Sequence, residues 1–138
     1  MKKEMFLCTA NSCRSQMAEG LAKEICKGVL EIYSAGLMSA TIHKKAIAVM
    51  KELGIDISEQ KSKTINEDLL REMDFVVTLC FNAEDLCPST PPGTKRIYWP
   101  IKDPVGMLGT EEEIMAEFRR TRDEIKGRVQ KLKEDLCP

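Results

Sequence analysis

The chain has 138 residues, of which 43% are hydrophobic and 31% charged, a balance that suits one globular domain with a single core. Its 21 basic and 22 acidic residues give a formal net charge of −1, so no global positive field draws it to nucleic acid or to anionic lipid. The apolar run at residues 5–7 is too short for a signal sequence or a membrane span. We expect one cytoplasmic, monomeric domain over residues 1–138 that binds neither nucleic acid nor membrane.

The first half of the chain alternates strand and helix signals. The apolar residues of 3–8 predict a short buried strand, and the helical spacing of apolar residues over 15–26 predicts a helix directly after it. Residues 32–34 predict a second strand. Residues 44–53 repeat the helical spacing and predict a second helix that Gly54 ends. The order so far is strand, helix, strand, helix.

The middle of the chain continues this order. Asn66 is expected to cap a short helix, and the continuous apolar run of residues 75–79 is typical of a central parallel strand. Residues 81–92 are rich in Asn, Asp, Ser, Thr and Pro, a composition that predicts a loop. Residues 95–99 predict a fourth strand.

A long helix closes the chain. Thr110 and Glu113 form a capping box, and one face of the following segment stays apolar as far as Leu132. Strands that alternate with helices in so short a chain predict an α/β fold, a small open parallel sheet with helices on both faces. Ligands of such sheets bind at the C-terminal ends of the strands, where Cys8 and Cys80 are both expected.

The six cysteines suit thiol chemistry better than a disulfide framework or a metal site. Cytosolic thiols are kept reduced, which argues against structural disulfides. The sequence contains no C-x2-C pair, and His43 is the only histidine, so a zinc site is not expected. We expect neither a metal nor a cofactor.

The loop between the first strand and the first helix, residues 8–15, has the features of an oxyanion site. It enters a helix N-terminus, where unpaired N–H groups and the positive end of the helix dipole favour a tetrahedral anion. Arg14 adds a planar guanidinium that suits two oxygens of that anion. The same field favours the ionised, nucleophilic form of Cys8. The alternative is that Cys8 is only a small buried residue at a strand end.

Two further side chains of this loop suit supporting roles. Ser15 can donate a hydrogen bond to the Cys8 thiolate, and Asn11 tolerates left-handed backbone geometry and can brace the loop. The residues expected to bind the oxyanion are Thr9, Ala10, Asn11, Ser12, Cys13, Arg14 and Ser15.

The stretch FLCTANSCRSQMAE, residues 6–19, closely resembles the low-molecular-weight tyrosine phosphatase superfamily and, within it, the thioredoxin-coupled arsenate reductases. The similarity covers nearly the whole chain and includes residues 33–36, 54–58, 76–80, 87–88 and 103–104. It implies a four-stranded parallel sheet flanked by helices, with Cys8 as the nucleophile and Asp103 as the general acid. The implied activity contributes to arsenic detoxification.

Cys80 and Cys87 favour the reductase over the phosphatase, because a phosphatase has no use for two additional thiols. We hypothesise that Cys8 attacks arsenate, that Cys80 then attacks Cys8 with release of arsenite, and that Cys87 attacks Cys80. Thioredoxin would reduce the final disulfide, and phosphate or sulfate would bind as an analogue of arsenate. If residues 80–87 were helical, the two cysteines would lie about 10 Å apart along the axis, so this segment would have to unwind or fold back.

Two alternatives stay open. If Cys80 is a core residue and Cys87 has no role, the chain is a phosphatase of phosphomonoesters; a third possibility is a non-catalytic oxyanion-binding or redox-sensing module. The chain has two Tyr and one Trp, with Tyr98 and Trp99 together on one strand, so a stacking wall for an aryl substrate is not evident. A small inorganic oxyanion suits the site better.

One departure from the resemblance concerns a cation. Some relatives hold a potassium ion near the loop through an Asn, a Glu, a Ser and an Asp. Asn11, Glu19 and Ser34 correspond to the first three, whereas Lys63 occupies the Asp position. We expect Lys63 either to pair with Glu19 in place of the ion or to point away.

The remaining cysteines and basic side chains are expected to be structural. Cys13 has no evident partner, Cys26 suits the core of a helix, and Cys137 is expected to be exposed in the terminal tail. His43 is expected at the surface. The basic cluster at residues 119–122 is interpreted as a solvated helix face, with a thioredoxin-facing role as the alternative.

Overall fold

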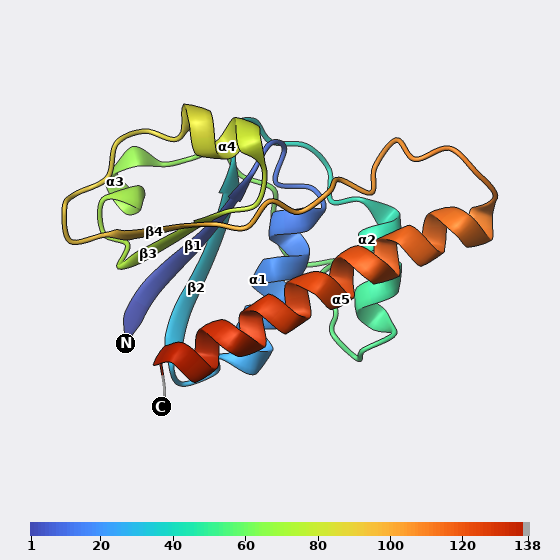
Figure 1. Ribbon diagram of the computed structural model, residues 1–138, viewed down its shortest axis with the longest axis horizontal. Coiled ribbons are helices and arrows are strands. Elements are labelled where there is room, and N and C mark those ends of the chain that lie inside the picture. The colour runs from blue at the N-terminus through green and yellow to red at the C-terminus, as the bar shows by residue number, and fades with distance from the viewer. Residues whose placement is uncertain (137–138) are drawn as a thin grey trace.

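The computed structural model describes residues 1–136 and contains a four-stranded parallel sheet in the order β2-β1-β3-β4 (Figure 1). The strands are β1 (Lys2–Cys8), β2 (Leu30–Gly36), β3 (Phe75–Thr78) and β4 (Lys95–Tyr98). The helices are α1 (Arg14–Ile25), α2 (Lys44–Lys51), α3 (Glu67–Leu70), α4 (Phe81–Leu86) and α5 (Glu111–Leu136). No helix within residues 1–136 combines the length and the apolar character that crossing a membrane requires.

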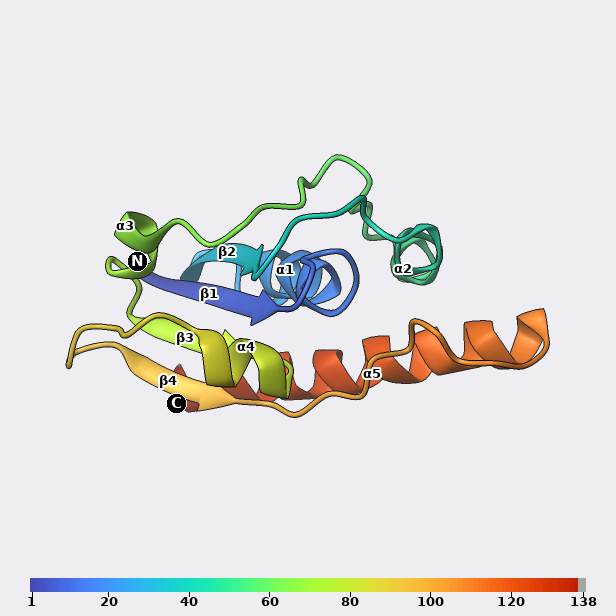
Figure 2. The ribbon, with the colours of Figure 1, turned by 90° about the horizontal axis from the view of Figure 1, so that it is seen from above.

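Helices cover both faces of the sheet, as the sequence predicts. Successive residues of β1 point to opposite faces. Met5 lines a hollow together with Leu69 of α3, whereas Phe6 faces Trp99, with ring centroids 5.9 Å apart. Arg128 of α5 lies over the same Trp99 ring, so α5 belongs to the Phe6 face. Figure 2 shows α5 running beside α1 and α2, with which it is packed.

Apart from α4, the expected order of elements is confirmed, and each end lies within four residues of its predicted position. Two of the predicted caps are also confirmed. The Asn66 side chain accepts a hydrogen bond from the Leu69 N–H at 3.1 Å. Thr110 and Glu113 exchange the two hydrogen bonds of a capping box, each 3.1 Å long.

The prediction of a loop over residues 81–92 is wrong in its first half, which forms α4. The Cys80 sulfur caps this helix by accepting a hydrogen bond from the Ala83 N–H at 3.4 Å. The prolines that suggested a loop begin only at Pro88, so the six residues of α4 contain no helix breaker.

Two side chains expected at the surface are partly or wholly buried. The His43 side chain caps α2 and its ring lies 4.9 Å from that of Phe118, and burial lowers the pKa of this histidine. Arg122 is buried and donates hydrogen bonds to the Val49 carbonyl at 2.8 Å and to Glu52 at 2.7 Å. Arg122 therefore joins α5 to α2. The interpretation of the basic cluster at residues 119–122 as a solvated helix face is wrong for Arg122.

Glu4 is a buried acid on the apolar side of the sheet. It points to the same face as Phe6 and is fully buried, and neither of its carboxylate oxygens has a hydrogen-bond partner among residues 1–136. Burial alone raises the pKa of this carboxyl well above its ordinary value of 4.5. Burial therefore favours the neutral form of the Glu4 carboxyl in the folded chain.

We predict that Glu4→Met stabilises the protein by about 1–3 kcal/mol at neutral pH, because it removes an unpartnered buried polar group. The gain should grow with pH. Above the ordinary pKa near 4.5, the unfolded chain releases the proton that the folded chain keeps, so stability with Glu4 falls as pH rises towards the raised folded value. Urea unfolding near pH 5 and pH 8 measures both effects. A gain independent of pH would contradict the prediction, and Glu31→Met on the exposed side of β2 is the control.

Candidate active site

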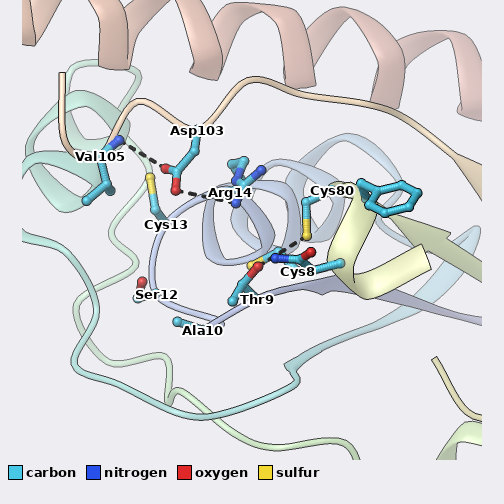
Figure 3. A pocket seen from close by; sticks show the side chains of 11 residues that line it. Cys8, Thr9, Ala10, Ser12, Cys13, Arg14, Cys80, Asp103 and Val105 are labelled. Carbon is cyan, nitrogen blue, oxygen red and sulfur yellow. Dashed lines mark hydrogen bonds and ion pairs between the residues drawn. The ribbon is translucent and has the colours of Figure 1, made fainter. Parts of the chain in front are cut away.

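A hollow of about 500 Å³ lies at the C-terminal ends of β1 and β3 (Figure 3). Its walls come from residues 8–10 and 12–14, from residues 80–82 and from Asp103 and Val105. The N-cap residue of α1, Cys13, makes no side-chain capping hydrogen bond, so the first N–H groups of this helix are not satisfied by the cap. A concave pocket at this edge of a parallel sheet suits an anion.

The loop of residues 8–15 is held in shape by Asn11. This residue adopts the left-handed conformation, with φ 48°, as its type allows. Its fully buried amide donates to Ser15 Oγ at 2.7 Å and to Ser34 Oγ at 3.0 Å, and its oxygen accepts from the Lys63 N–H at 2.9 Å. The bracing expected of Asn11 is therefore confirmed.

Gly36, at the end of β2, makes room for this loop. A Cβ atom added to Gly36 would lie 2.7 Å from the Asn11 backbone nitrogen and 2.9 Å from the Ala10 carbonyl carbon. Both distances are far below van der Waals contact. Only glycine lets β2 approach the loop so closely.

The Cys8 sulfur lies at the base of the loop, 2.8 Å from Ser15 Oγ. Since Ser15 Oγ already accepts a hydrogen bond from the Asn11 amide, its own proton is available to point at the sulfur. This geometry suits a Cys8 thiolate, the form that attacks electrophiles.

Arg14 and Asp103 meet at the opposite wall of the hollow (Figure 3). Arg14 is buried, donates to the Ile101 carbonyl at 2.9 Å and lies 3.5 Å from Asp103 Oδ2. The other oxygen of Asp103 accepts from the Val105 N–H at 3.0 Å. The structure therefore brings a cation and a carboxyl group, 89 residues apart in the chain, to the same pocket as Cys8.

Cys80 shares this pocket, whereas Cys87 does not line it. The Cys80 sulfur lies 3.3 Å from Thr9 Oγ1, on the loop that carries Cys8. Cys87 follows the other end of α4 and donates to the Pro88 carbonyl at 3.4 Å. Partial burial raises the pKa of the Cys87 thiol, which disfavours its thiolate form.

The other cysteines differ in their positions. Cys13 lines the pocket but is buried, and burial raises the pKa of its thiol far above the usual range. Its lack of a chemical role stays a prediction. Cys26 is buried at the end of α1, as expected. Cys137 lies outside the described residues.

Of two aromatic side chains at or beside the mouth, Phe81 was not predicted from the sequence, whereas Tyr98 was, on the fourth strand. Phe81 lines the pocket with 66% of its surface exposed, and Tyr98 lines an adjoining depression together with Arg14 and Cys80. The interpretation that no stacking wall for an aryl substrate is evident overlooked Phe81. It rested on Tyr and Trp alone, and the Phe81 ring reaches the mouth only because α4 carries it there.

Lys63 pairs with Glu19, which is one of the two arrangements expected from the sequence. Its ammonium lies 3.5 Å from Glu19 Oε1 and 3.5 Å from Ser34 Oγ, and Lys23 contacts the other Glu19 oxygen at 2.7 Å. Glu19 is buried and accepts a hydrogen bond from Ser34 as well. Two ammonium groups already neutralise this carboxylate, so the residues do not fit a potassium ion.

No cluster of three His, Cys, Asp or Glu side chains within residues 1–136 is arranged to hold a metal ion. The polar side chains around Glu19 are instead linked in a chain. Hydrogen bonds run from Glu19 through Ser34, Asn11 and Ser15 to the sulfur of Cys8. The buried Glu19 carboxylate, paired with two partly exposed lysines, is thereby connected to the base of the pocket.

Comparisons with known proteins agree with this architecture. The curated arsenate reductase of Bacillus subtilis (strain 168) is 51% identical over 129 residues, which cover 94% of this chain and 93% of that protein. A solved arsenate reductase in its phosphate-binding state is 39% identical, with a TM-score of 0.80 and 99% of both chains covered. A thioredoxin-dependent arsenate reductase of Corynebacterium glutamicum is 28% identical, with a TM-score of 0.77, and the match covers 99% of this chain and 62% of that one.

The sequence model described as low molecular weight phosphotyrosine protein phosphatase matches residues 3–137, almost the full length. The fold and the loop at the N-terminus of α1 agree with that match. This chain therefore belongs to the low molecular weight phosphotyrosine protein phosphatase family.

Proposed function

We propose that this chain reduces arsenate to arsenite by a relay of three thiols, Cys8, Cys80 and Cys87. The observation that carries the proposal is the shared pocket of Cys8 and Cys80, since hydrolysis requires only one thiol there. The half-identical Bacillus subtilis relative, named as an arsenate reductase, supports the same activity.

Arsenate binds in the loop of residues 9–15 in this proposal. The N–H groups at the start of α1 and the guanidinium of Arg14 surround its oxygens. Phosphate and sulfate have the same tetrahedral shape and bind as unreactive analogues, which the relative in a phosphate-binding state supports. The oxyanion-binding residues are Thr9, Ala10, Asn11, Ser12, Cys13, Arg14 and Ser15.

In the first step the Cys8 thiolate attacks arsenic and displaces one oxygen. Asp103, at the mouth of the pocket, gives that oxygen a proton so that it leaves as water. The hydroxyl of Ser15, 2.8 Å from the Cys8 sulfur, stabilises the thiolate before the attack.

In the second step the Cys80 thiolate attacks the Cys8 sulfur. A Cys8–Cys80 disulfide forms, and the electron pair of the broken sulfur–arsenic bond stays on arsenic, which leaves as arsenite. A phosphorus analogue cannot accept that pair and can only be hydrolysed.

In the third step the Cys87 thiolate attacks Cys80 and releases the Cys8 thiolate. The dithiol of thioredoxin then exchanges with the Cys80–Cys87 disulfide, which returns both cysteines to thiols and oxidises thioredoxin. The Corynebacterium glutamicum relative, described as thioredoxin-dependent, supports this choice of reductant.

We predict that Cys80→Ser and Cys87→Ser each abolish multiple-turnover arsenate reduction while leaving any hydrolysis of an aryl phosphate intact. Cys8→Ser should abolish both activities. Arsenate-dependent NADPH consumption with thioredoxin and thioredoxin reductase measures the first activity, and a glutaredoxin mixture tests the reductant. Cys137→Ser, which removes a thiol that the relay does not use, is the control and should keep both activities. A Cys80→Ser variant that reduces arsenate at the unmodified rate would refute the relay.

Phosphomonoester hydrolysis is the second candidate, and the exposed ring of Phe81 at the mouth favours it. An aryl phosphate can stack on this ring while its phosphate occupies the loop. The same variants separate the two candidates, because hydrolysis depends on Cys8 and not on Cys80. A non-catalytic module would show no turnover of either substrate even with thioredoxin present.

We predict that the rate of arsenate reduction does not respond to potassium, because the Lys63 ammonium occupies the position beside Glu19. Rates in KCl and NaCl should agree at equal ionic strength, because general salt screening is then equal. Lys63→Met should lower the rate, whereas Lys61→Met at a neighbouring exposed position should not. A several-fold stimulation of the unmodified protein by KCl would contradict the prediction.

A further inference from the structure

Helix α4 spans the chain between the second and third relay thiols. Cys80 caps its N-terminus and Cys87 follows its C-terminus. A helix of six residues is too short to be stable on its own, because nucleation is costly and few hydrogen bonds repay it. Tertiary contacts must therefore hold α4 in place.

Glu84 supplies the polar part of those contacts. The buried hydroxyl of Thr78, on β3, donates a hydrogen bond to the Glu84 carboxylate. Arg96, on β4, lies 3.7 Å from the other carboxylate oxygen and also donates to the Glu84 carbonyl at 3.3 Å. One side chain thus ties the middle of α4 to two strands of the sheet, while the buried Ala83 packs beneath it.

The closed helix and the Cys80–Cys87 disulfide exclude one another. Seven residues of helix separate the two Cα atoms by about 10 Å, whereas a disulfide requires about 4.4–6.8 Å. The helical hydrogen bonds from the Glu84 N–H to the Cys80 carbonyl and from the Cys87 N–H to the Ala83 carbonyl, 3.1 and 3.0 Å long, must break when the cysteines join. The Glu84 N–H donates the first of these bonds, so the Glu84 backbone has to move when that bond breaks.

We propose that Glu84 is a positioning residue that controls the thiol–disulfide equilibrium of Cys80 and Cys87 by holding α4 closed. The inference rests on the relay proposed above. Contacts that exist only in the dithiol form stabilise it relative to the disulfide. Glu84 therefore makes the disulfide easier for an incoming dithiol to reduce, and it slows the attack of Cys87 until α4 opens.

The test compares Glu84→Ala with Asp85→Ala, each combined with Cys8→Ser so that only one relay disulfide can form. Asp85 is the matched control because it is an exposed acid on the same helix. The fraction of Cys80–Cys87 disulfide is measured in glutathione redox buffers by alkylation and peptide mass analysis. Glu84→Ala should shift the equilibrium constant about tenfold towards the disulfide, roughly 30 mV for a two-electron couple. Asp85→Ala should shift it by less than about twofold, as expected for an exposed site without contacts.

The direction of the shift distinguishes this role from helix propensity. Alanine forms helices better than glutamate, so propensity alone would favour the closed dithiol form in Glu84→Ala. Thr78→Val, which removes only the hydroxyl donor, should shift the equilibrium in the same direction as Glu84→Ala. Glu84→Gln keeps an acceptor for Thr78 and should recover part of the effect.

Three outcomes would contradict the proposals, two of them the role of Glu84 and one the relay. If the disulfide forms equally in the unmodified and the Glu84→Ala proteins, Glu84 has no positioning role, although the relay stands. If no Cys80–Cys87 disulfide forms in any variant at any redox buffer ratio, the relay itself is wrong. A shift towards the dithiol in Glu84→Ala would also refute the positioning role.

Discussion

The hydrogen bonds of the Asn11 side chain fix the shape of the loop on which the candidate site depends. All four hydrogen-bonding positions of this amide are used: it donates to Ser15 and Ser34 and accepts from Gln16 and the Lys63 backbone. Inside the protein each of these bonds would be costly to leave unmade. The left-handed turn at Asn11 therefore has one stable arrangement, and that arrangement orients the hydroxyl next to Cys8.

The sheet then explains why a second thiol is close to the first. β1 and β3 are neighbours in the sheet, and Leu7 is paired with Thr78 across them. Parallel pairing carries both strands to the same edge, so Cys8 and Cys80, each one or two residues beyond this pair, enter one pocket. Cys87 lies at the other end of α4 and does not line this pocket. The pairing of β1 with β3 thus brings Cys8 and Cys80 together, whereas α4 separates Cys87 from Cys80.

The order of elements, the loop of residues 8–15 and the caps at Asn66 and Thr110 could be predicted because each rests on local signals. Apolar spacing, a cap residue and a strand that runs directly into a helix are all visible within a few positions of the sequence. The left-handed turn at Asn11 belongs to the same group, since residue type alone favours it.

The features that could not be predicted depend on contacts between distant segments. Contacts of Glu84 with β3 and β4 stabilise helix α4. The proline-rich residues that follow α4 favour a loop, so the sequence does not predict this helix. Burial of Arg122 depends on a carbonyl of α2, 73 residues earlier. The aromatic mouth at Phe81 exists only because α4 is a helix. Such placements follow from the tertiary structure, which short-range patterns do not contain.

Gly36 limits how this pocket can be altered by protein engineering. A side chain at that position would collide with main-chain atoms of Ala10 and Asn11, which cannot move aside as a flexible side chain can. The loop of residues 8–15, which forms the floor of the pocket, would have to shift. Phe81 and Tyr98, in contrast, are exposed at the rim and have room to be exchanged. Attempts to change substrate range should therefore begin at the rim and leave the floor intact.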